Sequence, residues 1–359
     1  FAPILTDGKA MDNIMISPFS ISSALSMTLN GAAGGTYEAM KKALDLDGKT
    51  LEQINETYLK LMTEMVPVDE RVVFEIANSV WVEKRLAVKQ KFISDVQNWY
   101  KAEARAIDVT NPDAVKIVNN WIAGKTHDKI TNMLESLNPD LAMLLINAVY
   151  FNGKWRNQFD KNNTNKEPFY LTTSTPRAVP MMHQKENLKV LKDKNLTVVD
   201  LPYGQGNFSM LIVLPDADIT TSDVIATLST TRWNNWMEWL PGNTHEVELS
   251  MPKFKYNYKR ILNDDLADLG MGVAFSDLAD FSNISNQALQ ISKVIHQSFI
   301  ETNEEGTEAA AATVVEMETT SAGPGTDPLV WKVNIDHPFL YYIYETSTGT
   351  ILFMGRVND

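Results

Sequence analysis

The chain has 359 residues, of which 44% are hydrophobic, enough apolar material for a large buried core. Its formal net charge is −13, from 32 Lys and Arg against 45 Asp and Glu, without a long run of either sign. An acidic surface argues against nucleic acid and anionic membranes as partners. With no cysteine, the chain has no disulfide framework, thiolate nucleophile or thiolate metal site. No apolar run approaches the about 18 residues that a membrane span needs.

The first third of the sequence carries helix signals. Ser17 followed by a proline is typical of a helix start, and Gly31 predicts the end of that helix. Residues 50–53 have the pattern of a capping box. Asn111, again before a proline, predicts the start of another helix with an apolar stripe. The sequence starts at Phe1 without a signal-peptide pattern, and trimming of a leader or of a first helix is kept as a hypothesis.

Strand patterns dominate after residue 141, so an α+β fold is expected. We see no internal repeat and no linker that would divide the chain into two domains. The predicted strands are 144–151, 197–203, 208–214, 245–251, 289–300, 339–344 and 351–357, the last two pairing across Ser347-Thr348-Gly349.

Residues 304–328 fit neither pattern. They lie between two predicted strands, and a loop of about 25 residues in a compact domain is unusual and often functional. In the first half, uncharged side chains occupy every second position, which predicts a strand able to bury one face. The uncharged series is Thr307, Ala309, Ala311, Thr313, Val315 and Met317. The alternatives are an Ala-rich helix extension or a flexible linker; the β-branched residues 313–315 argue against the helix.

Eight strings in register along the chain resemble the serpin family of protease inhibitors. They are NIMISPFSISSAL at 13–25, GAAGGTYEAM at 31–40, INAVYFNGKW at 146–155, MPKF at 251–254, ADFSNIS at 279–285, EEGTEAAAAT at 304–313, HPF at 337–339 and FMGRV at 353–357. The resemblance implies a single α+β domain over residues 1–359, with three β-sheets, about eight or nine helices and an exposed reactive-centre loop at about 304–328.

The resemblance also implies inhibition through a change of fold. A target protease cleaves the reactive loop and forms an acyl-enzyme, and the freed segment then inserts as a strand into the main sheet and traps the enzyme. The hinge of this movement would consist of Glu304, Gly306, Thr307, Glu308, Ala309, Ala310, Ala311 and Ala312.

The scissile bond follows from counting. In inhibitory relatives the cleaved residue lies 14 positions after the hinge glycine, which places the bond at Thr320-Ser321. A small β-branched residue before the bond suits an elastase-like pocket and not a trypsin-like one. The segment 320–338 is longer than in many members of the family, so Thr319, Ser321 and Ala322 stay open as alternatives for the cleaved residue.

Six further positions match supporting sites of the family. Ser17, Ser20, Asn147 and His296 match the shutter, where the central strands part. Trp155 and Lys253 match the breach, where the loop enters, and Lys253 is expected to pair with Glu304. If the resemblance is set aside, His296 is interpreted as a core residue with satisfied hydrogen bonds and Trp155 as a core aromatic. The pair of Lys253 and Glu304 is then interpreted as two solvated charges that contribute under about 1 kcal/mol.

The sequence shows no enzyme motif. There is no G-x-S-x-G and no H-E-x-x-H, and the five histidines have no metal-ligand spacing. We therefore expect no enzyme activity, no cofactor and no metal. Heparin binding is not expected, because the predicted helix over 50–65 carries three glutamates against one lysine.

The expected partner is an elastase-like serine protease, with a cysteine protease as an open alternative, since both classes pass through an acyl-enzyme. The protein is expected to be a monomer and to act outside the cell or otherwise outside the cytoplasm. The rival interpretation is a non-inhibitory serpin acting as a carrier, storage or chaperone protein. Its hinge would carry charged or bulky residues on the buried face, whereas this hinge carries alanine and threonine.

Overall fold

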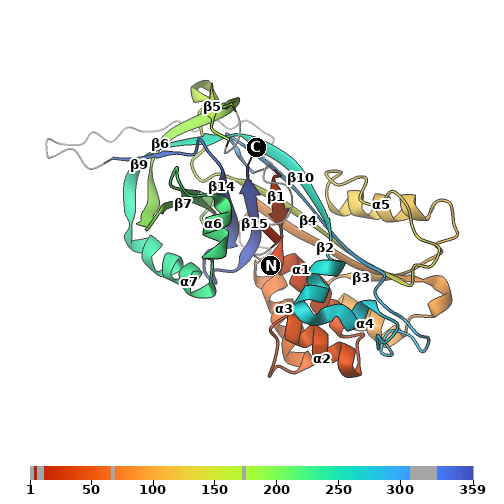
Figure 1. Ribbon diagram of the computed structural model, residues 1–359. Helices are drawn as coiled ribbons and strands as arrows, with labels where there is room; N and C mark the ends of the chain where they lie inside the picture. The colour runs from red at the N-terminus through yellow and green to blue at the C-terminus, as the bar shows by residue number, and fades with distance from the viewer. Residues whose placement is uncertain (1–3, 6–11, 66–68, 172–174, 308–329, 359) are drawn as a thin grey trace.

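The computed structural model describes residues 4–5, 12–65, 69–171, 175–307 and 330–358. Two β-sheets form the body of the molecule (Figure 1). In the view of Figure 1, helices α1 to α4 gather at one end, α5 lies beside strands β2 and β4, and α6 and α7 lie near β7 and β14.

Eight α-helices occur in the described part of the chain, in agreement with the expected number. They are α1 (Pro18–Leu29), α2 (Gly34–Ala43), α3 (Leu51–Met65), α4 (Gln90–Tyr100), α5 (Ala114–Lys125), α6 (Thr221–Ala226), α7 (Thr230–Trp239) and α8 (Asn263–Leu266). A π turn (Ala267–Met271) and short 3-10 turns (Lys84–Leu86, Lys161–Asn163, Leu240–Gly242 and Gly272–Phe275) complete the helical segments.

The predicted helix signals explain where α1 and α3 begin. Ser17 caps α1, because its Oγ accepts a hydrogen bond from the backbone N–H of Ser20 at 3.3 Å. The capping box of α3 is formed as expected: Thr50 and Gln53 exchange side-chain to backbone hydrogen bonds of 2.9 and 3.2 Å. Helix α5 begins three residues after Asn111, at Ala114.

The smaller sheet has six strands in the order β10-β11-β12-β4-β2-β3. Its central strands β11 and β4 also pair directly with each other, in parallel. Strand β11 begins four residues later than expected, at Lys293. The strands are β2 (Val72–Glu83), β3 (Glu103–Ile107), β4 (Met143–Lys154), β10 (Phe254–Ile261), β11 (Lys293–Asn303) and β12 (Gly306–Thr307).

The larger sheet has nine strands: β1-β15-β14-β8-β7-β6-β9-β13, with β5 paired to β6. The resemblance implied three sheets, whereas hydrogen bonding in the described residues produces two. The reason is the 17-residue strand β6, which pairs with β5 and β9 and, at its C-terminal end, with β7. The strands are β1 (Ile14–Ile16), β5 (Asn165–Phe169), β6 (Arg177–Asp193), β7 (Leu196–Tyr203), β8 (Phe208–Pro215), β9 (Thr244–Pro252), β13 (Trp331–Asn334), β14 (Phe339–Glu345) and β15 (Ile351–Val357).

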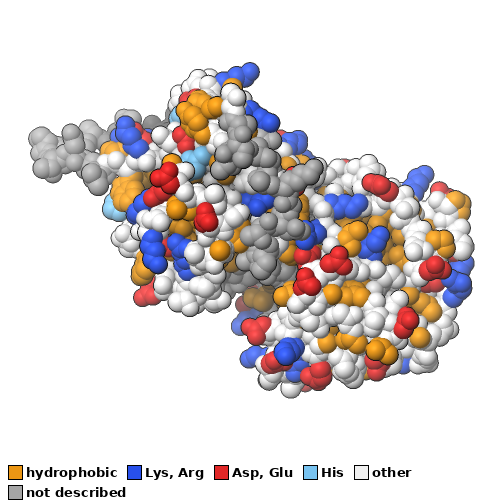
Figure 2. All heavy atoms as spheres, in the orientation of Figure 1, with side chains coloured by type: hydrophobic (Ala, Val, Ile, Leu, Met, Phe, Trp, Pro, Cys, Tyr) orange, Lys and Arg blue, Asp and Glu red, His pale blue; other side chains and the backbone are white. Residues whose placement is uncertain are grey.

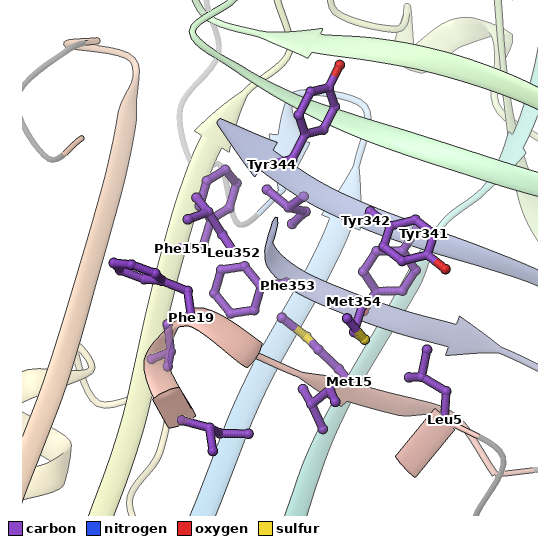
Figure 3. Packing of buried hydrophobic residues seen from close by; sticks show 14 of the residues in the cluster. Leu5, Met15, Phe19, Phe151, Tyr341, Tyr342, Tyr344, Leu352, Phe353 and Met354 are labelled. Atoms are coloured by element: carbon purple, nitrogen blue, oxygen red, sulfur yellow. The ribbon is translucent and has the colours of Figure 1, made fainter. Parts of the chain in front are cut away.

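The main core lies between the two sheets. Phe353 from the larger sheet meets Phe74 and Phe151 of the smaller one edge-to-face, with ring centroids 6.0 and 5.9 Å apart. Figure 3 shows Phe151 and Phe353 converging from different strands. A second apolar cluster joins α5 and the residues after it to the opposite face of β2, β4 and β11, with Trp81 and Trp121 in contact. The six-stranded sheet is therefore packed on both faces.

The surface agrees with the mixed charge pattern of the sequence. Figure 2 shows positive and negative side chains interspersed over the face in view. None of the helices in the described residues combines the length and apolar character needed to cross a membrane.

Candidate functional site

Strand β12 is a short wedge between the two central strands of the six-stranded sheet. On one side Thr307 and Gly306 pair with Thr302 and Asn303 of β11, and on the other side with the last residues of β4. Beyond the wedge, β11 and β4 pair directly, residues 293–298 against 144–149. The central strands are thus separated by β12 at one end and in contact with each other further along.

The first residues of the expected reactive loop are part of this sheet and are not exposed. Residues 304–307 are buried, which corrects the expectation of an exposed loop from residue 304. The chain turns at Glu304 and Glu305, and their carbonyl groups accept hydrogen bonds of 2.9 Å from the backbone N–H groups of Phe159 and Trp155. These bonds hold the turn against the segment that follows β4.

Gly306 fits the wedge because it lacks a side chain. Its φ is +152°, and a Cβ atom at this position would lie 2.1 Å from the carbonyl oxygen of Gly153. Any other residue would push β12 away from β4. The hinge glycine is therefore required by close backbone packing as well as by its φ angle.

Thr307 is the first residue of the predicted buried face, and the structure does bury it, at 1% exposure. Its Oγ1 lies 2.6 Å from the hydroxyl of Tyr203 and 3.4 Å from that of Thr302. Tyr203 stacks on Trp155, with ring centroids 4.5 Å apart and an angle of 10° between the rings. Thr307 therefore contacts an aromatic pair that links β7 to the residue directly after β4.

Trp155 joins the turn to the end of β4. Its Nε1 donates to the carbonyl oxygen of Asn303 at 2.9 Å, and its backbone N–H donates to Glu305. The residue is 2% exposed, so it is also a core aromatic. The predicted breach position thus contacts the turn that opens β12.

Glu304 and Lys253 form the expected ion pair, with Nζ 2.8 Å from Oε2 and 3.1 Å from Oε1. The Glu304 side chain is only 7% exposed, so the pair is not two freely solvated charges. Thr164 donates a further hydrogen bond of 2.8 Å to the carboxylate. Burial alone would raise the pKa of the Glu304 carboxyl, but the hydrogen bonds to the ionised form outweigh it and hold the pKa below its usual value.

A second ion pair flanks the first. Lys161 contacts the carboxylate of Glu305, whose side chain is 10% exposed. The ion pair with Glu305 raises the pKa of Lys161. Two adjacent glutamates at the turn are therefore neutralised by lysines from different segments, which fixes both ends of the turn.

The four residues predicted for the shutter lie together in a buried polar cluster. His296 Nδ1 lies 2.6 Å from Asn147 Oδ1, and its Nε2 accepts from the backbone N–H of Ser17 at 3.2 Å. Asn147 donates to the carbonyl oxygen of Ser20 at 3.0 Å. Ser17 Oγ donates to the carbonyl oxygen of Leu352 at 2.6 Å. The cluster ties α1 and β15 to the two central strands.

These contacts settle the protonation of His296. Since Nε2 accepts from Ser17, the proton of the neutral ring is on Nδ1, which donates to Asn147. Complete burial lowers the pKa of the His296 imidazole to about 3. The ring is therefore neutral at physiological pH.

Several members of both clusters were not predicted from the sequence. Asn78 accepts from Asn147 at 2.6 Å and donates to Ser23 at 3.1 Å, and Ser298 donates to the carbonyl oxygen of Met15 at 2.7 Å. The available signal was a polar residue inside an apolar stretch, as at Asn78 in β2. The other members carry no signal of this kind, because their contacts join segments that are distant in the chain. They are Tyr203, Thr302, Thr164 and Lys161.

The remaining predicted residues lie outside the described part of the structure. They are Glu308, Ala309, Ala310, Ala311 and Ala312 of the hinge, and Thr320 and Ser321 of the scissile bond. Their roles stay predictions.

The described site is built for strand pairing and carries no set of groups for covalent catalysis. Its polar groups are engaged with one another or with backbone atoms, and its ionised groups are paired. Within the ranges that the structure describes, no group of three or more His, Cys, Asp or Glu side chains is placed to hold a metal ion.

Comparison with known proteins decides the family. The model of the serpin family, described as serine protease inhibitors, matches residues 3–359. The chain belongs to the serpin family. Serpins are described as serine protease inhibitors and not as enzymes.

Similar serpins come from distant organisms. An uncharacterised serpin-like protein of Methanosarcina acetivorans is 35% identical over 96% of this chain and 81% of its own length. The leukocyte elastase inhibitor of Homo sapiens is 35% identical over 99% of this chain and 95% of its own length.

Solved structures agree with the fold. Native Tengpin, a thermophilic serpin, has a TM-score of 0.89 at 32% identity, covering 100% of this chain and 91% of Tengpin. Human thyroxine-binding globulin with its ligand has a TM-score of 0.87 at 30% identity, covering 97% of this chain and 92% of that one.

Proposed function

We propose that this serpin inhibits a protease by inserting its cleaved reactive loop between β4 and β11. The observation that carries the proposal is the β12 wedge, because its two residues already pair with both central strands. Continuing β12 in the same direction would run along β4 towards its first residues, where β11 and β4 now pair with each other. The site is thus a partly opened sheet with the hinge at its entrance.

Insertion of the loop makes both unfavourable and favourable contributions to the free energy. Six register pairs between β11 and β4 must separate, and the new strand then pairs on both sides. Each backbone hydrogen bond contributes about 0.5–1.5 kcal/mol net, against an ordering cost of about 1–2 kcal/mol per residue. These terms nearly cancel, so burial of the uncharged face of the loop has to supply the driving force. Apolar residues such as Val315 and Met317 offer about 1.5–3 kcal/mol each when fully buried.

The sequence of the hinge supports inhibition over a carrier function. Four alanines follow Glu308, and small uncharged residues enter a closing sheet without a desolvation penalty. Because thyroxine-binding globulin is among the similar structures, a carrier, storage or chaperone function is the second candidate.

We propose elastase-like serine proteases as targets, with cleavage at Thr320-Ser321. The small β-branched Thr320 supports this specificity, as does the similarity to a protein named leukocyte elastase inhibitor. Replacement of Thr320 with Arg is expected to redirect the inhibitor towards trypsin-like enzymes, whose pocket carries a buried acid.

The test is a panel of serine and cysteine proteases followed by denaturing electrophoresis. A covalent complex that survives denaturation supports inhibition, and sequencing of the released peptide locates the bond. In parallel, the melting temperature is measured before and after limited cleavage near Thr320. A large increase indicates insertion, whereas an unchanged or lower value together with no covalent complex would favour the carrier function.

A further inference from the structure

A cavity of about 310 Å³ lies at the end of the β4–β11 contact that is farthest from the β12 wedge. Its walls include Leu144 and Lys293, the first register pair of the direct pairing between the two strands. The segments that precede β4 and β11 supply most of the remaining wall, together with Phe275. We call this space the far cavity. It adjoins the place where a strand entering at the wedge would end.

Lys293 lines the far cavity and has no counter-ion in the part of the chain that the structure describes. The residue is partly buried. By contrast, Lys161 and Lys253 near the wedge each contact a glutamate. Asp140 also lines the cavity, but it is exposed and forms no ion pair with Lys293. Because a carboxylate beside a partly buried ammonium group compensates the loss of hydration, the far cavity suits an acidic side chain.

Strands β4 and β11 keep one register along their whole contact. At the wedge, Thr307 pairs with Gly153 of β4 and with Thr302 of β11, and these two partners are 149 positions apart in the sequence. In the direct pairing, Leu144 and Lys293 are also 149 positions apart. A new strand can therefore enter when the two strands separate sideways, and neither strand has to slide along its own axis.

The common register determines which loop residue would reach the far cavity. Counting on from Thr307, position 316 falls opposite Leu144 on one side and opposite Lys293 on the other. This position is a glutamate, which lies outside the described residues, so the placement applies to the inserted form alone. Directly opposite side chains on paired strands share a face, with Cβ atoms about 4.5–5.5 Å apart. Glu316 and Lys293 would therefore be within reach of each other.

The residues before Glu316 on the same face agree with this placement. They are Ala310, Ala312 and Val314, all uncharged. Their register neighbours belong in large part to the second apolar cluster, which α5 covers, and include Ala148, Ile146, Ile295 and Phe299. A charge returns on this face only at position 316, where the neighbour on β11 is a lysine. The order of apolar and charged residues in the loop thus matches the order along the two strands.

We propose that the far cavity is the docking site for residues 316–318 of the cleaved loop, with Lys293 as the counter-ion of Glu316. The proposal rests on the proposed function and adds the side chain that positions the last rows of the inserted strand. Since β4 begins at Met143 and β11 at Lys293, Glu316 is the last loop residue with a register partner in both strands. Cleavage at Thr320 leaves Glu316 on the inserted segment, four residues before its end.

The test is hydrogen–deuterium exchange of the full chain before and after limited cleavage near Thr320, measured on the amides of residues 144–146 and 293–295. In the cleaved protein, Lys293→Gln and Glu316→Gln should each raise exchange about two- to fivefold, as expected for loss of an opposite-charge pair across two strands. Before cleavage each variant should change exchange less than about 1.5-fold, because the two residues are then not paired.

Combined variants show whether the two residues act as a pair. The double variant Lys293→Gln with Glu316→Gln should exchange no faster than either single variant. Exchanging the charges, Lys293→Glu with Glu316→Lys, should restore the wild-type rate in the cleaved protein, whereas Lys293→Glu alone should raise it most. Additive effects of the two glutamine variants, or no rescue by the charge exchange, would overturn the proposal.

Two control variants exclude a general effect of charge. Glu318→Gln removes the next acidic residue on the same face, which falls beyond the ends of both strands. Lys259→Gln removes an exposed lysine of β10. Both should leave the exchange of the cleaved protein close to that of wild type. Equal effects of the variants at 316 and 318 would also contradict the proposal.

The same experiment separates this proposal from the proposed function. If the loop inserts, cleavage of the wild type should slow exchange of residues 295–298, because the new strand then covers the route between β4 and β11. Slower exchange there without coupling between Lys293 and Glu316 would contradict the docking site and leave inhibition by insertion standing. Unchanged exchange after cleavage, together with the absence of a covalent protease complex, would contradict both.

Discussion

His296 and Asn147 are register partners in the direct pairing of β11 with β4, and His296 Nδ1 donates to Asn147 Oδ1 over 2.6 Å. This bond spans the line along which an inserted strand would separate the two central strands. Both side chains are almost completely buried, at 0% and 1% exposure. The pair therefore links the stability of the closed sheet to the route of insertion.

The neutral, buried state of His296 predicts a loss of stability in acid. Its pKa of about 3 in the folded protein lies below the ordinary value of 6.5, so the unfolded chain binds the proton first. The contribution of His296 to the free energy of unfolding is fully present above pH 6.5 and is lost as the pH falls towards 3. Between pH 6.5 and 4.5 the loss from this residue is about 2–3 kcal/mol.

This prediction is checked by urea unfolding as a function of pH. His296→Gln should flatten the dependence over pH 6.5–4.5, whatever its effect at neutral pH. His245→Gln is the matched control and should keep the wild-type dependence. An unchanged slope in the His296 variant would show that the residue does not titrate as its burial predicts.

Removal of the Tyr203 hydroxyl should loosen β12. Tyr203→Phe deletes the 2.6 Å contact to Thr307, at a cost of about 1 kcal/mol. Faster hydrogen exchange is expected at Gly306 and Thr307. Tyr342→Phe is the control, since the Tyr342 hydroxyl is buried and has no hydrogen-bond partner among the described residues, so its loss should be neutral or stabilising. Equal effects of both variants would argue against an anchoring role for Tyr203.

Loss of Lys253 should cost more than loss of an exposed lysine. Lys253→Met leaves the Glu304 carboxylate, 7% exposed, with Thr164 as a remaining side-chain donor. We expect unfolding to become easier by about 1–3 kcal/mol. Lys332→Met breaks a pair whose side chains are 74% and 45% exposed, and should cost under about 1 kcal/mol. Chemical denaturation of both variants checks this, and similar losses would contradict it.

Thr307→Arg should convert the inhibitor into a substrate. The Thr307 side chain is buried over Tyr203, and an arginine there would bring an unpaired charge into the sheet. The protease should still cleave the loop while the covalent complex disappears from gels. Thr307→Ser, which keeps the hydroxyl, is the control and should form complex normally. Full complex formation by the arginine variant would rule out insertion from this hinge.

The sequence by itself pointed to the serpin family and the α+β class and located seven of the fifteen strands of the described residues, because hydrophobic periodicity and motifs are local properties. The alternation that starts at Thr307 predicted a buried face, and its first residue is buried. Ser17 and the capping box at 50–53 set helix starts through contacts within one turn, which sequence shows directly.

The tertiary structure alone decided which distant residues meet. Tyr203 lies 104 positions from Thr307, and Asn78 lies 69 positions from Asn147, so no local pattern could pair them. Strand β6 pairs with β5, β7 and β9, so the described strands form two sheets and not the three that the resemblance implied. Gly306 lies inside the sheet, close to the carbonyl oxygen of Gly153 on β4. The sequence could not show this placement, because strand pairing joins residues that are distant in the chain.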